Sequence, residues 1–332
     1  MPCHAQREGL QSKMIREPLF EAPSTASIIE IGCTLGYVAP KPTPAFFMLQ
    51  PHSQSGQTIV EEKLTSSVDM PVDRMTDLYG NRILKTVLVA GYNEFRYEAL
   101  VNAAECSKQP LFSANADSLQ ALPLEIMRYA LPSRYCDSDK LLQFAAQKFG
   151  DIPHPGEQAH AICNWVHRNL EYRYGSGDST LSALEAIQRG YGVCRDFSHV
   201  VIALCRALDI PARYVAGYIP RTEDNAVEGE NDIGVDFHAY AEIYFSGQWN
   251  IFDARYNRSF KGMVKIAHGL DAVDAAFASF YGNVEPVKFQ VWARPVDAAT
   301  LAIPSPADAA PVHIPHYGLP SCGSAETARL SE

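Results

Sequence analysis

The chain has 332 residues, a net charge of −10, 47% apolar residues and 20% charged residues. This composition is typical of soluble globular proteins, and the length predicts about two domains. An acidic chain lacks the basic surface that non-specific nucleic-acid binding needs. No apolar run approaches the roughly 20 residues that cross a bilayer. We therefore expect neither a nucleic-acid nor a membrane partner.

The first residues of the chain and the pattern of its cysteines indicate in which cellular compartment the protein is expected. Residues 1–8 lack the apolar core of a secretion signal. The eight cysteines are scattered and form no CxxC pair, which in a chain of this length is typical of reduced thiols. Both features predict a cytoplasmic location.

The first part of the chain is predicted to be β-rich. Residues 1–25 are polar and are expected to be disordered or an extension. Apolar and polar residues alternate over 29–38 and 85–89, and residues 79–82 supply a turn signal. We predict an N-terminal antiparallel β-domain over residues 26–108.

Helical signals follow. Residues 109–150 are expected to be a linker with a helical segment, and an apolar face recurs over 157–169. Ser182 and Glu185 have the spacing of a capping box, and Gly190 is placed to end that short helix.

A second helix is predicted over 194–208, because its apolar residues share one face. That face consists of Phe197, Val200, Val201, Leu204 and Leu208. A strand is expected over 212–218, and two further strands meet at Ser246 and Gly247. A last strand is predicted over 287–292.

The cysteine at the start of this helix has the environment of a nucleophile. Cys194 directly follows a glycine-rich turn. Free N–H groups and the helix dipole at a helix N-terminus stabilise an anion, so they favour the thiolate. The same N–H groups are suited to an oxyanion. A buried structural cysteine remains the alternative interpretation.

The predicted hairpin brings a histidine and an aspartate together. A two-residue turn at Ser246 and Gly247 places Tyr240 opposite Asp253, and His238 lies on the same face as Tyr240. His238 and Asp253 are then diagonal neighbours with backbones about 7–8 Å apart, within reach of both side chains. A slip of one residue would send Asp253 to the other face.

Three motifs in this order resemble the transglutaminase-like superfamily of papain-like folds. They are Gly-Val-Cys-Arg-Asp-Phe at 192–197, Asp-Phe-His-Ala at 236–239 and Phe-Asp-Ala at 252–254. The resemblance covers roughly residues 28–295. It implies an α+β protein in which the N-terminal antiparallel β-domain precedes a papain-like, transglutaminase-like catalytic domain, which we place at 151–300. Residues 301–332 are expected to be a disordered tail.

The resemblance implies that Cys194, His238 and Asp253 form a catalytic triad acting on amide carbonyls through a thioacyl intermediate. Hydrolysis, as in a cysteine protease or amidase, is the first expectation. Transamidation of protein glutamine with an amine acceptor and a non-catalytic peptide-binding module are the alternatives. The expected partner is a peptide or protein substrate, with no cofactor and no metal; the oligomeric state stays open.

For the other polar residues, a catalytic or metal-binding role is compared with a packing or surface role. Tyr174 and Gln188 could donate to an oxyanion, but surface or packing roles are favoured. His199 is expected to pack or hydrogen-bond. His160 and His167 flank Cys163 on one helix, but no carboxylate or paired cysteine joins them, so a metal site is not expected.

Overall fold

The computed structural model of the chain describes residues 27–53, 56–103, 122–220, 236–258 and 262–296. The predicted extension at 1–25 and the predicted tail at 301–332 lie outside these residues. Within the described part, no helix is long and apolar enough to cross a membrane.

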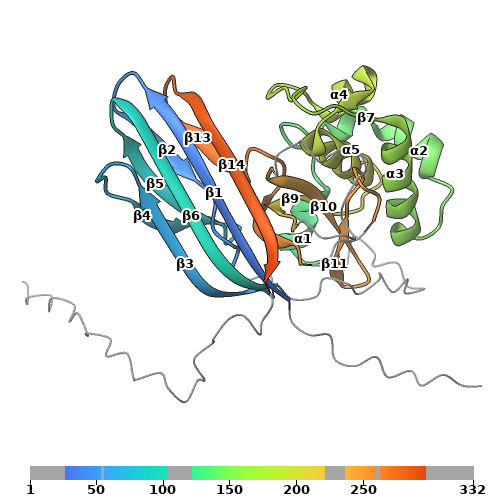
Figure 1. The fold of residues 1–332 in the computed structure, drawn as a ribbon. Coiled ribbons are helices and arrows are strands. Elements are labelled where there is room, and N and C mark those ends of the chain that lie inside the picture. Colours follow the sequence, from blue (N-terminus) through green and yellow to red (C-terminus); the bar gives the residue numbers. More distant parts are fainter. Residues whose placement is uncertain (1–26, 54–55, 104–121, 221–235, 259–261, 297–332) are drawn as a thin grey trace, which may run out of the picture. The chain divides into compact units, whose positions relative to one another are not determined.

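Two antiparallel sheets form the β-rich part of the structure (Figure 1). The first has the order β14-β1-β6-β3, and the second has the order β13-β2-β5-β4. The strands of the first sheet are β1 (Ser27–Ala39), β3 (Thr58–Ser66), β6 (Gly91–Ala103) and β14 (Glu285–Val296). Those of the second are β2 (Thr43–Phe47), β4 (Asp73–Thr76), β5 (Arg82–Leu88) and β13 (Ala278–Phe280).

The core between these sheets follows from residue alternation. Along β6, every second residue from Asn93 onward is buried, as expected for a strand with one face on a core. Phe95 on β6 meets Phe47 on β2 with ring centroids 4.7 Å apart, and Tyr37 on β1 meets Phe280 on β13 at 4.8 Å. Aromatic pairs therefore link the two sheets.

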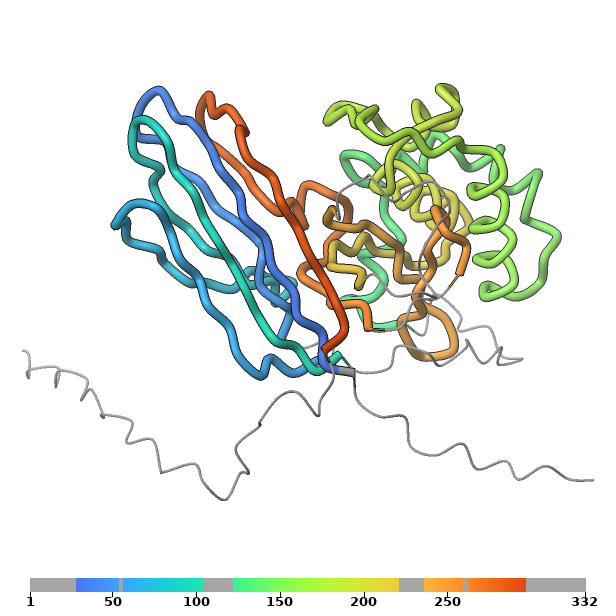
Figure 2. The backbone as a smooth tube through the Cα atoms, in the orientation of Figure 1, coloured from blue at the N-terminus to red at the C-terminus, as the bar shows by residue number. Residues whose placement is uncertain are grey.

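The last strand joins the first sheet. β14 runs antiparallel to β1 from Ile28 opposite Val296 to Val38 opposite Glu285. Figure 2 shows these two segments, far apart in the sequence, lying side by side. From the sequence, this strand is predicted to belong to the catalytic domain at 151–300. In the structure it hydrogen-bonds to β1 of the N-terminal sheet. The chain thus returns to the first β layer after the helices; the predicted domain boundaries stay predictions.

A third sheet and a group of helices form the rest of the described chain. The sheet has the order β11-β10-β9-β12, with β9 (Ala212–Tyr218), β10 (His238–Phe245), β11 (Gln248–Phe252) and β12 (Val264–Gly269). The α-helices are α1 (Leu124–Met127), α2 (Leu142–Phe149), α3 (Pro155–Asn169), α4 (Ala183–Arg189) and α5 (Cys194–Arg206). The short elements are η2 (Arg128–Ala130), η3 (Ser138–Lys140) and the parallel pair β7 (Glu171–Tyr172) and β8 (Tyr191–Gly192).

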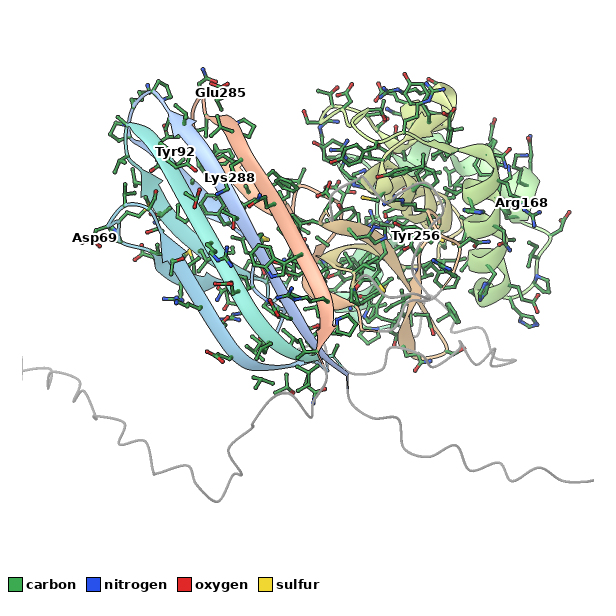
Figure 3. All side chains as sticks on the ribbon, in the orientation of Figure 1. Asp69, Tyr92, Arg168, Tyr256, Glu285 and Lys288 are labelled. Atoms are coloured by element: carbon green, nitrogen blue, oxygen red, sulfur yellow. The ribbon has the colours of Figure 1, made fainter. Side chains whose placement is uncertain are left out.

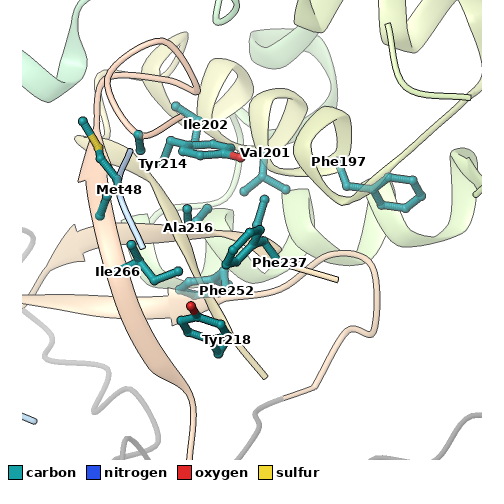
Figure 4. Close-up of a cluster of buried hydrophobic side chains, with 14 of the residues drawn as sticks. Met48, Phe197, Val201, Ile202, Tyr214, Ala216, Tyr218, Phe237, Phe252 and Ile266 are labelled. Atoms are coloured by element: carbon teal, nitrogen blue, oxygen red, sulfur yellow. The ribbon is translucent and has the colours of Figure 1, made fainter. Parts of the chain in front are cut away.

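Helix α5 lies at the centre of this half. It packs against β9 and β10 on one side and against α3 and α4 on the other. Figure 4 shows Val201 and Ile202 of α5 beside Tyr214 and Ala216 of β9. The apolar stripe predicted an amphipathic helix, but every residue from Asp196 to Arg206 is buried. The helix is therefore enclosed on all sides, and it holds its Cys194 end in a fixed position.

The sequence signals for α4 are confirmed. The Ser182 hydroxyl accepts the backbone N–H of Glu185 at 3.4 Å, and the Glu185 carboxylate accepts the N–H of Ser182 at 2.8 Å. Gly190 ends the helix with φ of 76°, a left-handed conformation that suits glycine. The predicted fold class, an α+β protein with an N-terminal antiparallel β region before a transglutaminase-like domain, is confirmed.

Candidate active site

The start of α5 fixes the position of Cys194. The backbone N–H of Val193 donates to the Asp196 carboxylate at 2.9 Å, which is one half of a capping box. Valine has no side-chain acceptor to complete the other half. Gly192 makes this possible, because a Cβ there would lie 2.6 Å from Asp196 Oδ2. The glycine thus lets the carboxylate fold back beneath the turn that presents Cys194.

The buried Asp196 is compensated by its neighbour. Arg195 donates to Asp196 Oδ1 from Nε at 3.2 Å and from an Nη at 3.1 Å, and to the carbonyl of Asp178 at 2.7 Å. Ser198 Oγ donates to the Cys194 carbonyl at 2.9 Å. The residues around the cysteine are therefore locked by hydrogen bonds.

The predicted hairpin register is confirmed. Tyr244 pairs with Trp249 and Ala241 with Phe252. The turn residues Ser246 and Gly247 have φ of 54° and 74°, as a two-residue hairpin turn requires. This register brings the start of β10 beside the residue after β11.

His238 and Asp253 meet at that point. His238 Nε2 donates to Asp253 Oδ2 at 2.7 Å, and both side chains are buried. The backbone N–H groups of Arg255 and Tyr256 donate to Asp253 Oδ1 at 3.0 and 3.4 Å. The carboxylate is therefore held by the backbone and in turn holds the imidazole.

Cys194 lies close enough to His238 to contribute to its pKa, and both residues line the same cavity. Since Nε2 is bonded to Asp253, Nδ1 is the ring nitrogen left for the sulfur. Burial lowers the pKa of His238, but the Asp253 carboxylate and Cys194 outweigh it and raise this pKa from 6.5 to about 9. The structure thus brings the three predicted residues together, with Cys194 beside the hydrogen-bonded His238–Asp253 pair and a histidine that holds its proton at neutral pH.

Aromatic and cationic groups pack around this row. The ring of Tyr256, labelled in Figure 3, lies 5.6 Å from that of His238. The Arg255 guanidinium lies 4.5 Å from the Tyr256 ring centroid and 3.6 Å from that of Tyr172. These groups keep the His238–Asp253 bond away from water, which strengthens it.

Cys194 and His238 both line a cavity of about 430 Å³. Cys194 is half-buried, whereas the other described cysteines, Cys33, Cys136, Cys163 and Cys205, are buried, and none of the five forms a disulfide. Burial raises the pKa of Cys33, Cys136 and Cys163 to about 12, so these thiols stay protonated. Among the described cysteines, Cys194 is the accessible one.

Comparison with known proteins places this site in a family. The model of the transglutaminase-like superfamily matches residues 143–254, a span that contains Cys194, His238 and Asp253. A solved structure from Cytophaga hutchinsonii, named as a candidate cysteine protease, is 34% identical, with a TM-score of 0.73 over 82% of this chain and 92% of that one. The chain belongs to the transglutaminase-like superfamily.

Relatives of this chain with lower sequence identity come from mycobacteria. An uncharacterized protein of Mycobacterium leprae is 25% identical over 250 residues, covering 73% of this chain and 88% of its own length. An uncharacterized protein of Mycobacterium tuberculosis is 28% identical over 117 residues, 35% of this chain and 37% of its own. Members of the transglutaminase-like superfamily are generally enzymes.

The other polar residues weighed from the sequence lie elsewhere. Tyr174 is 54% exposed and lines a different cavity, and Gln188 is exposed on α4. His199 is buried, stacks on Tyr135 with centroids 5.0 Å apart, and accepts the backbone N–H of Ala272 at 3.2 Å. The packing and hydrogen-bonding role expected for His199 is confirmed.

The three candidate metal ligands on α3 point to separate partners. His160 packs edge-on against Phe252, Cys163 donates to Asn257 Oδ1 at 3.7 Å, and His167 Nδ1 lies 3.0 Å from the carbonyl of Ala254. Over the residues with assigned positions, no group of three or more His, Cys, Asp or Glu side chains is placed to hold a metal ion.

Sequence reasoning missed one wall of the cavity. It is formed by the turn between β12 and β13, which contributes Ala272, Ala275, Ala276 and Phe277. This stretch has neither a helical nor a strand period, so periodicity gives no signal for it. The one sequence hint is its run of small residues.

Proposed function

We propose that the protein hydrolyses amide bonds of a peptide or protein through a thioacyl intermediate on Cys194. The observation that carries this proposal is that Cys194 lies beside the hydrogen-bonded His238–Asp253 pair, with the sulfur and the imidazole both open to one cavity. The name of the Cytophaga hutchinsonii protein, a candidate cysteine protease, supports it.

In the first step, the Cys194 thiolate attacks the amide carbonyl carbon and a C–S bond forms. The His238 imidazolium, stabilised by Asp253, gives its proton to the amine nitrogen as the C–N bond breaks. The amine leaves, and the acyl group stays on the sulfur as a thioester. His238 is then neutral and ready to act as a base.

The start of α5 stabilises the tetrahedral species in this step. The backbone N–H of Cys194 belongs to the first turn, where no intrahelical acceptor is available. Together with the helix dipole, it favours negative charge on the carbonyl oxygen. The hydrogen bond from the Val193 N–H to Asp196, for which Gly192 leaves room, keeps this turn rigid, so the donor is in place before the reaction.

In the second step, water attacks the thioester carbonyl while neutral His238 takes a proton from the water. The C–S bond breaks, a carboxylic acid is released, and the thiolate–imidazolium pair returns. A primary amine in place of water gives transamidation by the same steps. Hydrolysis is favoured because water reaches the open cavity without a dedicated binding site.

The test uses a complex peptide mixture in H₂¹⁸O, with and without an added fluorescent primary amine. Hydrolysis by the wild-type protein places ¹⁸O in new carboxyl groups, and Cys194→Ala abolishes this. Incorporation of the amine instead of ¹⁸O would assign the protein to transamidation and overturn hydrolysis. Products that are identical for wild type and Cys194→Ala would overturn both reactions.

A further inference from the structure

The floor of the cavity beside Cys194 is made of apolar side chains, most of them alanines. Ala216 on β9, Ala239 on β10 and Ile266 on β12 line it, and all three are buried. The facing turn contributes Ala275, which is buried, and Ala276, which is half-buried. The space exists because four of these five positions carry alanine, where a larger residue would fill it.

Apart from His238, whose charge is paired with Asp253, the charged side chains among the described lining residues do not offer a free charge to the interior. Arg195 is held by Asp196 Oδ1 and the Asp178 carbonyl. The side chain of Asp236 retains solvent exposure, and desolvation raises the pKa of its carboxyl, which weakens its negative charge. A charged group entering the cavity would lose its water without gaining an opposite charge inside, whereas an apolar group would gain by leaving water.

The wall opposite the floor is fixed before any ligand binds. Ala272 N–H donates to His199 Nε2, which accepts because burial lowers the pKa of His199 and keeps it neutral. Phe277 stacks on Phe237 with centroids 5.0 Å apart, and its carbonyl accepts the N–H of Met48 at 3.0 Å. Met48, which follows β2, and His199, five positions after Cys194, therefore hold this wall in place.

We infer that this cavity is a specificity pocket for a bulky, uncharged apolar side chain next to the reacting amide, and that Ala276 sets its size. The inference rests on the proposed function for the identity of the substrate as a peptide or protein. The apolar preference itself depends only on the cavity and on the reactivity of Cys194.

The test measures alkylation of Cys194 by three chloroacetamides that differ on nitrogen: methyl, benzyl and 2-aminoethyl. Each rate is divided by that for free cysteine, so that only recognition by the protein remains. For wild type we expect benzyl to exceed methyl about tenfold or more, as burial of several carbons in an apolar pocket gives. The 2-aminoethyl probe is expected to show no gain.

Ala276→Phe fills the cavity and is expected to remove the benzyl preference, and Ala276→Val to reduce it. Val273→Phe is the matched control, because Val273 lies in the same turn, is 55% exposed and does not line the cavity. It is expected to keep the preference. Thermal melting of each variant establishes that it is folded, and Ala276→Val serves if Ala276→Phe does not fold.

Equal rates for methyl and benzyl in wild type, or fastest labelling by the 2-aminoethyl probe, would overturn the inference. So would a folded Ala276→Phe that retains the benzyl preference. Failure of the proposed function is a separate result, because it appears as absent ¹⁸O incorporation while the alkylation preference persists.

Discussion

Asp253→Asn isolates the electrostatic part of the site. The substitution keeps the shape of the side chain and removes one negative charge at 2.7 Å from His238 Nε2. His238 then loses the strongest contribution that raises its pKa, and the burial that lowers this pKa remains. We expect the imidazole to become neutral near pH 7, so that the thiolate of Cys194 loses its stabilising cation.

The size of the effect follows from the titration of His238. A rise in pKa from 6.5 to about 9 corresponds to about 3 kcal/mol of preference for the charged imidazole. Loss of that preference slows a reaction that needs the thiolate–imidazolium pair by about a hundredfold. We therefore expect alkylation of Cys194 by iodoacetamide at pH 7 to be about a hundredfold slower in Asp253→Asn.

Quantitative mass spectrometry of the peptide that carries Cys194 provides the rate. Asp137→Asn is the matched control, because Asp137 is also buried and accepts the backbone N–H of Leu184 at 3.1 Å, outside the cavity. It is expected to leave the rate unchanged. Asp253→Asn labelled at the wild-type rate, or an equal loss in Asp137→Asn, would refute the reasoning.

Two further predictions concern stability. A pKa of His238 raised from 6.5 to about 9 stabilises the folded state fully below pH 6.5, and this contribution disappears as the pH rises to 9. Urea unfolding should thus show the free-energy gap between wild type and His238→Gln shrinking by up to about 3 kcal/mol over this range; a constant gap would contradict it. Gly192→Ala, whose Cβ would lie 2.6 Å from Asp196 Oδ2, should lower stability by about 1–3 kcal/mol in thermal unfolding. Gly177→Ala, whose Cβ would lie 3.8 Å from Val193, should cost much less, and equal losses would argue against the steric explanation.

The parts of the site that depend on local rules were predictable from the sequence. The two-residue turn fixes the register of β10 and β11, so the proximity of His238 and Asp253 follows from counting along the hairpin. The capping box and Gly190 define α4, and hence the turn that leads to Cys194. Each of these rests on neighbours within a few residues or on one hairpin.

The parts that depend on long-range packing were not predictable. Nothing in the sequence of β14 indicates that it pairs with β1, whose residues lie at the other end of the chain. The complete burial of α5 depends on elements that cover it from both sides, whereas its periodicity shows only one apolar face. The cavity wall that includes Ala272 and Phe277 is positioned by His199 and Met48, which are distant in sequence.

Acylation of Cys194 tests the central claim most directly. The protein is incubated with p-nitrophenyl acetate, quenched in acid and digested, and the acetyl group is located by mass spectrometry. We predict a hydroxylamine-sensitive acetyl thioester on Cys194 in wild type and its near-complete loss in His238→Gln. Acetylation that bypasses Cys194, or that is equally strong on Cys194 in His238→Gln, would contradict the account.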